Sequence, residues 1–152
     1  MKIDAIMTAP VETCGPDDNL GEAARAMWTH DCGVLPVVAA DGHVQGILTD
    51  RDICMALATR DRPAARIAVR EVATQAVHAC VEGDDVETAL DTMRTQRIRR
   101  LPVLDRDGHL KGLLSINDIV LHAGKRPGEV AADRLVAALK GICSHRAPVA
   151  AV

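Results

Sequence analysis

The chain has 152 residues and a formal net charge of −3, which fits one compact unit or two small units that share a core. The weak negative charge gives no reason to expect a nucleic acid or an anionic membrane as partner, and Trp28, the sole aromatic residue, leaves little for base stacking. The first residues lack a signal-peptide pattern and no apolar run reaches membrane-spanning length, so we expect a cytoplasmic protein.

The sequence contains an internal repeat. Residues 6–53 align with residues 72–119 at a constant offset of 66 without a gap. A gapless match of this density indicates duplication, and two copies are too few for a solenoid. Identical pairs include Thr8/Thr74, Cys14/Cys80, Asp18/Asp84, Met27/Met93, Gly46/Gly112 and Asp52/Asp118.

Each repeat predicts the order strand, helix, strand, strand, helix. Short extended segments at 11–14 and 77–81 precede helices that we expect to begin near Asp18 and Asp84, whose side chains suit an N-cap. The spacing i, i+3, i+4, i+7 gives each helix one buried face. These faces are Leu20, Ala23, Ala24 and Met27 in the first copy, and Val86, Ala89, Leu90 and Met93 in the second.

Two short apolar strands follow in each repeat, at 35–39 and 44–48 and again at 101–104 and 110–114. An Asp-Gly pair joins them, which predicts hairpins, and second helices are expected at 50–59 and 116–123. The charged segment 60–70, which contains Pro63, is expected to cross the surface. These patterns predict a first repeat at 1–60, a linker at 61–70, a second repeat at 71–124 and a helical appendage with a tail at 125–152.

The appendage has no counterpart in the repeat. Residues 129–143 are expected to be helical and 147–152 to be a frayed end. On the first helix, Trp28 stands at the edge of the buried face, a position that belongs more often to the core than to an interface. The apolar residues expected near one face of the appended helix are Val130, Leu135, Val136, Leu139 and Ile142.

A hydroxyl residue and a carboxylate three positions later mark each strand-to-helix junction, as Thr49 and Asp52 and as Ser115 and Asp118. This spacing is a capping box. It also suits a ligand, because a helix N-terminus favours phosphate and a carboxylate accepts hydrogen bonds from ribose hydroxyls. The sequence leaves both uses open, and they are compatible.

Residues 3–123 resemble a tandem pair of CBS domains, together called a Bateman module. The motifs that carry the resemblance are Ile6-Met-Thr8, Gly33-Val-Leu-Pro-Val37, Ile98-Arg-Arg-Leu-Pro-Val103, the Asp-Gly turns and Gly46-Ile-Leu-Thr-Asp-Arg-Asp-Ile53. The resemblance implies an α/β (α+β) fold of two β-α-β-β-α repeats, paired through their sheets about a pseudo-two-fold axis, with two clefts between them. It further implies a homodimer that binds AMP, ADP, ATP or S-adenosylmethionine as a regulatory ligand and acts on an effector, here a separate protein.

The resemblance assigns expected roles by position. Asp52 and Asp118 would hold ribose hydroxyls, while Thr49 and Ser115 would meet phosphate or ribose. The adenine ring would lie against the segments after Thr8 and Thr74 and against backbone near Val34, before Pro36 and Pro102.

Three arginines are further candidates. Arg99 and Arg100 precede the second Leu-Pro and are either a solvated strand end or a phosphate-neutralising pair. Arg51 is a weaker candidate because its repeat counterpart is Asn117. The two clefts are therefore expected to differ.

Duplication explains the repeated pairs His43/His109 and Cys14/Cys80, and no structural-zinc spacing occurs, so we expect no metal and no required cofactor. The five scattered cysteines predict reduced thiols that are mostly buried. No nucleophile elbow, P-loop or Rossmann pattern appears, so no enzyme activity is expected.

Two functions remain as alternatives. One is a sensor that binds an adenosine-containing ligand. The other is a structural or interaction module with empty clefts. The apolar C-terminal helix ending Lys140-Gly-Ile-Cys-Ser144 resembles hypoxia-response CBS pairs, in which nucleotide binding is not assured.

Overall fold

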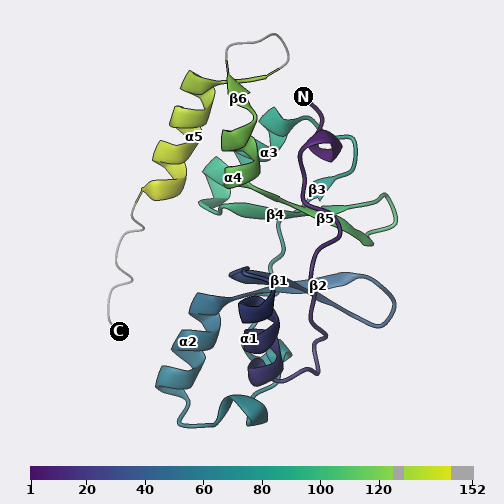
Figure 1. The fold of residues 1–152 in the computed structure, drawn as a ribbon, viewed down its shortest axis with the longest axis vertical. Helices are drawn as coiled ribbons and strands as arrows, with labels where there is room; N and C mark the ends of the chain where they lie inside the picture. The colour runs from purple at the N-terminus through teal and green to yellow at the C-terminus, as the bar shows by residue number, and fades with distance from the viewer. Residues whose placement is uncertain (125–128, 145–152) are drawn as a thin grey trace.

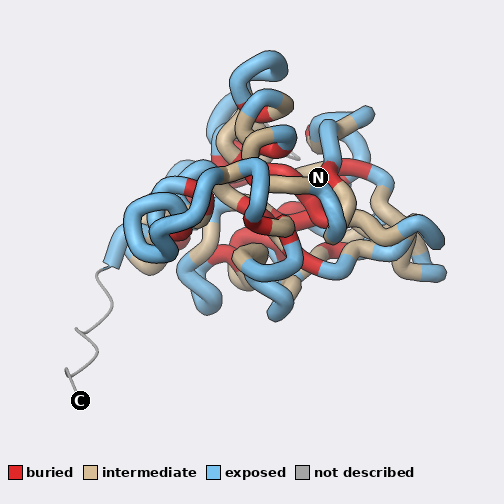
Figure 2. The backbone as a smooth tube through the Cα atoms, turned by 90° about the horizontal axis from the view of Figure 1, so that it is seen from below, coloured by how far each residue is buried: buried red, intermediate tan, exposed pale blue. Residues whose placement is uncertain are grey.

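The computed structural model describes residues 1–124 and 129–144, so the end predicted to fray lies outside the described residues. The two repeats are stacked, with their strands facing each other across the middle and their helices on the outer sides (Figure 1). Many of the buried residues lie in these central strands, whereas the outer sides of the helices and the turns are exposed (Figure 2). Within the described ranges, no helix combines the length and apolar character needed to cross a bilayer.

The predicted order of elements is confirmed except for the first strand of the first repeat, which the structure does not form. The first repeat contains α1 (Leu20–Thr29), β1 (Val34–Val38), β2 (Val44–Thr49) and α2 (Asp50–Thr59). The second contains β3 (Cys80–Val81), α3 (Val86–Gln96), β4 (Arg100–Leu104), β5 (Leu110–Ser115) and α4 (Ile116–Leu121). Short 3-10 helices η1 (Ile3–Ala5), η2 (Ala64–Arg66) and η3 (Val69–Glu71) precede the repeats, and β6 (Ala123–Gly124), β7 (Val130–Ala131) and α5 (Ala132–Cys143) follow them.

The two hairpins are copies of each other. Val34 pairs with Thr49 in β1–β2, and Arg100 pairs with Ser115 in β4–β5, both antiparallel. The glycines of the Asp-Gly turns have φ of +87° at Gly42 and +89° at Gly108, a conformation that side chains disfavour. A short strand was expected before the first helix of each repeat. In the second repeat it forms as β3, which runs parallel to β4. In the first repeat it is reduced to a single bridge between Cys14 and Val37.

The predicted N-caps were displaced by one residue. Asn19 caps α1 in a capping box with Glu22, and Asp85 precedes α3 without a capping side-chain bond. Asp18 instead accepts the backbone N–H of Gly15 at 2.6 Å, so it closes the turn before the helix. Asp84 accepts that of Val81 at 2.9 Å in the same way.

Each repeat receives part of its core from the segment that leads into the other. Ile3 and Ile6 pack in the core of the second repeat, while Ile67 and Val69 pack in the core of the first. The prediction that 60–70 crosses the surface was therefore wrong for these last two, since both Ile67 and Val69 have 0% exposure. The prediction relied on the charged residues and Pro63 of this segment. It overlooked Ile67 and Val69, which alternate with polar residues near its end.

The buried helix faces are confirmed, but two residues beside them were misplaced. Trp28 is 90% exposed because it follows Met27 by one residue, about 100° around α1 from the buried face. Val136 is 48% exposed for the same reason, one residue beyond buried Leu135 on α5. The helix α5 packs along α3, where Arg134 forms ion pairs with Glu87 at 3.3 Å and Asp91 at 3.5 Å.

Candidate functional site

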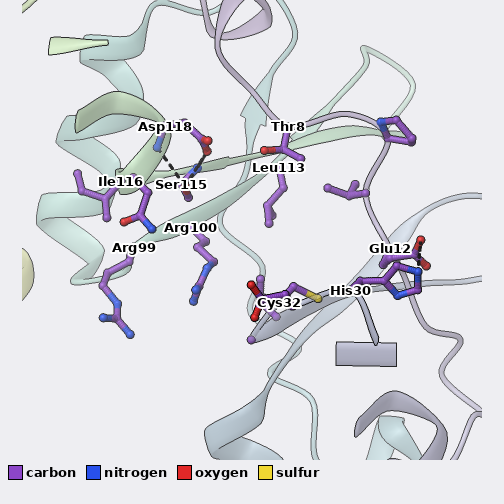
Figure 3. Close-up of a pocket in the computed structure, with 16 residues that line it drawn as sticks. Thr8, Glu12, His30, Cys32, Arg99, Arg100, Leu113, Ser115, Ile116 and Asp118 are labelled. Carbon is purple, nitrogen blue, oxygen red and sulfur yellow. Dashed lines mark hydrogen bonds and ion pairs between the residues drawn. The ribbon is translucent and has the colours of Figure 1, made fainter. Parts of the chain in front are cut away.

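A cavity of about 540 Å³ lies between the two repeats. Its walls come from the segment after η1, the loop between α1 and β1, the start of β4 and the junction of β5 with α4 (Figure 3). Both repeats therefore build it. The lining residues are Thr8, Pro10, Val11, Glu12, His30, Asp31, Cys32, Gly33, Val34, Arg99, Arg100, Leu113, Ser115, Ile116, Asn117 and Asp118.

The junction of β5 with α4 is a complete capping box. Oδ2 of Asp118 accepts hydrogen bonds from the backbone N–H of Ser115 at 2.7 Å and from its hydroxyl at 2.6 Å. The Asp118 N–H donates to Ser115 Oγ at 3.2 Å. The other carboxylate oxygen, Oδ1, makes no hydrogen bond with a described residue, so it retains its capacity to accept one.

The first repeat builds the same cap away from this cavity. Asp52 Oδ2 accepts from Thr49 N at 2.9 Å and from Thr49 Oγ1 at 2.7 Å, which matches the second repeat closely. Neither residue lines the cavity. The capping interpretation is thus confirmed for both pairs. The pairs differ in that Ser115 and Asp118 line the cavity and Thr49 and Asp52 do not.

The structure brings six of the predicted site residues to the cavity and leaves six outside it. Those that line it are Thr8, Val34, Arg99, Arg100, Ser115 and Asp118. Those that do not are Thr49, Arg51, Asp52, Thr74, Pro36 and Pro102. The two prolines are buried within β1 and β4, consistent with a role in packing the strands.

The cavity has a cationic wall and a mixed wall. Arg99 and Arg100 make no ion pair or side-chain hydrogen bond with any residue in the described ranges, so both guanidinium groups are available to an anion. Across from them Oε1 of Glu12 lies 3.3 Å from Nε2 of His30 (Figure 3). An elongated ligand with a negative end would lie with that end toward the arginines.

Sequence reasoning missed Glu12, His30 and Cys32. All three lie beside segments that were predicted correctly, the stretch after Thr8 and the approach to Gly33. The repeat gives a signal for two of them: His30 and Cys32 come just before Gly33, the counterpart of Arg99, and the cavity brings the two segments together.

A glycine allows the Thr8 segment to reach the cavity. A Cβ on Gly112 would lie 2.8 Å from the carbonyl oxygen of Thr8 and 2.7 Å from Sδ of Met7. This close approach permits the two backbone hydrogen bonds between Thr8 and Leu113, both 3.0 Å. The counterpart contact is similar: a Cβ on Gly46 would lie 3.0 Å from the carbonyl oxygen of Thr74.

The repeated cysteines and histidines are accounted for by packing and turns. Burial, with a smaller contribution from Asp18, raises the pKa of the Cys14 thiol to about 12, and burial with Asp84 does the same to the pKa of Cys80. The rings of His43 and His109 contact each other where the hairpin turns meet, with centroids 4.6 Å apart and planes tilted by 45°.

One group of metal-type side chains occurs within residues 1–124 and 129–144. Asp105, Asp107 and His109 place one ligand atom each within 4.8 Å of one another. Asp105 Oδ1 already accepts the backbone N–H groups of Asp107 at 3.0 Å and His109 at 2.9 Å, and these bonds lower its pKa. The group is thereby explained as a hydrogen-bonded turn.

A duplicated unit that encloses a polar cavity with its own copy defines a two-repeat binding module. Comparison with known proteins gives the family: the CBS domain profile matches residues 3–59 and 69–124, and the chain belongs to the CBS domain family. The predicted tandem pair is confirmed.

Comparisons with two relatives agree with this family. It is 29% identical over 142 residues to hypoxic response protein 1 of Mycobacterium tuberculosis, covering 93% of this chain and 94% of that protein. A structure of Hypoxic Response Protein I with two coordinated zinc ions has a TM-score of 0.74 at 28% identity, covering 82% of this chain and 100% of the other. The CBS domain pair of protein MJ0100, in complex with 5-methylthioadenosine and S-adenosyl-L-methionine, has a TM-score of 0.73 at 26% identity, covering 80% and 94%.

Proposed function

We propose that the cavity between the repeats binds an adenosine-containing ligand, AMP, ADP, ATP or S-adenosylmethionine, and that binding regulates a separate effector protein. The observation that carries the proposal is the Asp118 carboxylate, fixed by its cap through Oδ2 while Oδ1 bonds to none of the residues that the structure describes, beside a cavity of about 540 Å³. A related CBS pair, that of protein MJ0100, holds two adenosyl compounds. The proposal involves binding and transmission in the cytoplasm, without a catalytic step.

Six residues of the cavity wall have a role in this proposal. Asp118 Oδ1 accepts from the ribose hydroxyls, and Ser115 at the start of α4 stands where a hydroxyl or phosphate oxygen would approach. Arg99 and Arg100 neutralise phosphate. Thr8 and Val34 contribute backbone and aliphatic contacts to the adenine ring.

Isothermal titration of the reduced protein with AMP, ATP and S-adenosylmethionine tests the proposal. Asp118→Asn is expected to weaken binding about tenfold or more, because the hydrogen bonds to a charged acceptor are lost. Asp52→Asn is the matched control, since Asp52 makes the same cap bonds outside the cavity and is expected to leave affinity unchanged. Absence of heat with every ligand would contradict the proposal.

The arginines distinguish the ligand classes. Replacing both Arg99 and Arg100 by alanine is expected to weaken AMP and ATP about tenfold or more and to affect S-adenosylmethionine little, because only the nucleotides carry phosphate. An equal loss of affinity for all three ligands would show that the arginines support the folded structure of the site. It would contradict their proposed role in binding phosphate.

A second candidate is an interaction module whose cavity holds no nucleotide. The favouring observation is that the hydroxyl of each cap is already hydrogen-bonded to its own carboxylate. Mass spectrometry of small molecules that co-purify with the protein separates the two candidates, because an adenosyl compound bound in stoichiometric amount supports the sensor alone.

A further inference from the structure

The outer side of the first repeat carries an apolar groove between α1 and α2. It has a volume of about 610 Å³, and Trp28, Cys54 and Leu57 are among the residues that line it. Trp28 is 90% exposed and Leu57 is 41% exposed. An exposed tryptophan beside an apolar groove is typical of a surface that a partner covers, because tryptophan is enriched among the residues that carry binding energy.

The second repeat shows which kind of element covers such a face. Its outer side carries the helix α5, which packs along α3 (Figure 1). Leu90 and Arg94 of α3 line the cleft between these two helices. Their counterparts at the offset of 66, Ala24 and Trp28, line the groove. Among the described elements, α5 has no counterpart beside α1, so the groove has the position of a seat for a helix that the first repeat does not supply.

Charge distinguishes the two faces. On the second repeat, Arg134 of α5 forms an ion pair of 3.5 Å with Asp91 of α3. The counterpart of Asp91 is Arg25, which lies on α1 one turn before Trp28, is exposed and forms no ion pair with any residue in the described ranges. A helix that covers α1 as α5 covers α3 would therefore carry an acidic residue where α5 has Arg134. This reversal favours a helix of a different protein over α5 of a second copy.

The groove also shares a wall with the cavity between the repeats. Asp31, Cys32 and Gly33 line both of them. This loop is held to the end of α1, since the Cys32 N–H donates to the Met27 carbonyl oxygen at 3.0 Å. A ligand in the cavity and a helix in the groove would thus contact the same three residues.

We propose that the groove docks an amphipathic helix of the effector protein, with an apolar stripe over Trp28 and Leu57 and an acidic residue facing Arg25. Docking of a helix in a groove is a common mode of recognition and needs no ligand. The coupling rests on the function proposed above: the shared loop links the two sites, so the ligand and the helix change each other's affinity by the same factor.

Titration of the full chain in reducing buffer with two synthetic peptides tests the docking. Both peptides span residues 129–144 with Cys143→Ser, and one also carries Arg134→Glu, so they differ at the position that would face Arg25. The Arg134→Glu peptide is expected to bind about fivefold more tightly, because attraction replaces repulsion. Arg25→Glu in the protein is expected to reverse this preference. Absence of binding by both peptides, or a preference that Arg25→Glu leaves unchanged, would overturn the proposal.

A second pair of variants locates the contact. Trp28→Glu is expected to weaken peptide binding about tenfold or more without loss of folding, since the side chain is 90% exposed. Leu121→Glu is the matched control, because Leu121 is 81% exposed on α4 and does not line the groove. Sedimentation of the same proteins identifies the competing occupant: a wild-type dimer that Trp28→Glu dissociates would show that a second copy fills the groove, against the proposal.

Repeating the titration with saturating AMP separates the docking from the ligand proposal. The affinity for the Arg134→Glu peptide is expected to rise about fivefold, because a ligand against the loop Asp31–Gly33 fixes one wall of the groove before the helix arrives. Peptide binding without AMP binding would contradict the ligand proposal and support the docking alone. AMP binding that leaves the peptide affinity unchanged would overturn the coupling.

Discussion

Asp118 illustrates how one carboxylate serves both structure and binding at the scale of a residue. Its Oδ2 stabilises the first turn of α4 by accepting two hydrogen bonds from Ser115. These bonds also fix the direction of Oδ1, so the cap orients the group that the proposed ligand would use. Asp52 has the cap without the cavity.

The structural part of this role can be measured without a ligand. Asp52→Ala and Asp118→Ala are each expected to lower the free energy of unfolding by about 1–2 kcal/mol, because each leaves a capping hydroxyl and an N–H without their acceptor. Urea denaturation followed by circular dichroism checks this. A loss for one variant alone would show that the two caps are not equivalent.

Thiol reactivity should follow burial. At neutral pH Cys14 and Cys80 remain protonated because burial raises the pKa of each to about 12, and the thiolate is the reactive form. Cys54 and Cys143 are exposed and Cys32 is half-buried, so the prediction that the five cysteines are mostly buried was wrong. Peptide mapping after brief treatment with iodoacetamide is expected to find Cys54 and Cys143 modified well before Cys14 and Cys80. Early modification of Cys14 would contradict its buried position.

At the scale of the elements, α5 has the pattern of an amphipathic helix that covers one face of α3. Leu135 is 8% exposed and Ala138 is 3% exposed, whereas Val136 is 48% exposed. Burial of these side chains, with the ion pairs of Arg134 at the margin, holds the helix in place.

Leu135→Ala is expected to lower the free energy of unfolding by about 2–3 kcal/mol, because it removes buried methyl groups and leaves a cavity beside α3. Val136→Ala is the matched control and is expected to stay within about 0.5 kcal/mol of the wild type. Thermal or urea unfolding of both variants gives the comparison. Equal effects would show that α5 is rotated relative to the arrangement described.

Local patterns predicted most elements, and they failed where a tertiary partner decides the outcome. The Asp-Gly turns and the junction at Thr49 placed both hairpins and α2 correctly, because these signals act within a few residues. Trp28 and Val136 lie at the edges of apolar helix faces and are exposed. Helical periodicity does not reveal how far the neighbouring elements cover such a face. The site followed the same division: the sequence predicted both caps, but only the packing of the repeats determines that Ser115 and Asp118 line the cavity.

At the scale of the whole molecule, the two repeats exchange the segments that lead into them. Residues around Ile3 pack on the second repeat, and residues around Val69 pack on the first. The pairing is symmetric in backbone hydrogen bonds as well: Ile3 N donates to Asp84 O at 3.0 Å, and Val69 N donates to the counterpart oxygen of Asp18 at 2.8 Å. Neither core is therefore complete within one contiguous repeat.

This exchange predicts that the repeats unfold together. Ile3→Ala is expected to lower the free energy of unfolding by about 2–4 kcal/mol, because Ile3 is fully buried in the core of the second repeat. Since the chain that leads from Ile3 to the first repeat runs along the cavity wall at Thr8, the loss should destabilise the first repeat as well. Lys2→Ala is the matched control, because the Lys2 side chain forms an exposed ion pair with Asp85, and such pairs contribute little to stability.

Hydrogen exchange read by mass spectrometry checks the coupling. In Ile3→Ala, the slowest amides of β1–β2 and of β4–β5 are expected to exchange faster by the same factor, because both are then released by one global opening. Acceleration confined to β4–β5, or two separate transitions in calorimetry, would show that the repeats unfold independently. If both repeats open together, a ligand bound between them stabilises the whole chain. Ligand binding would then affect the outer helices through this shared stability, without a separate chain of contacts.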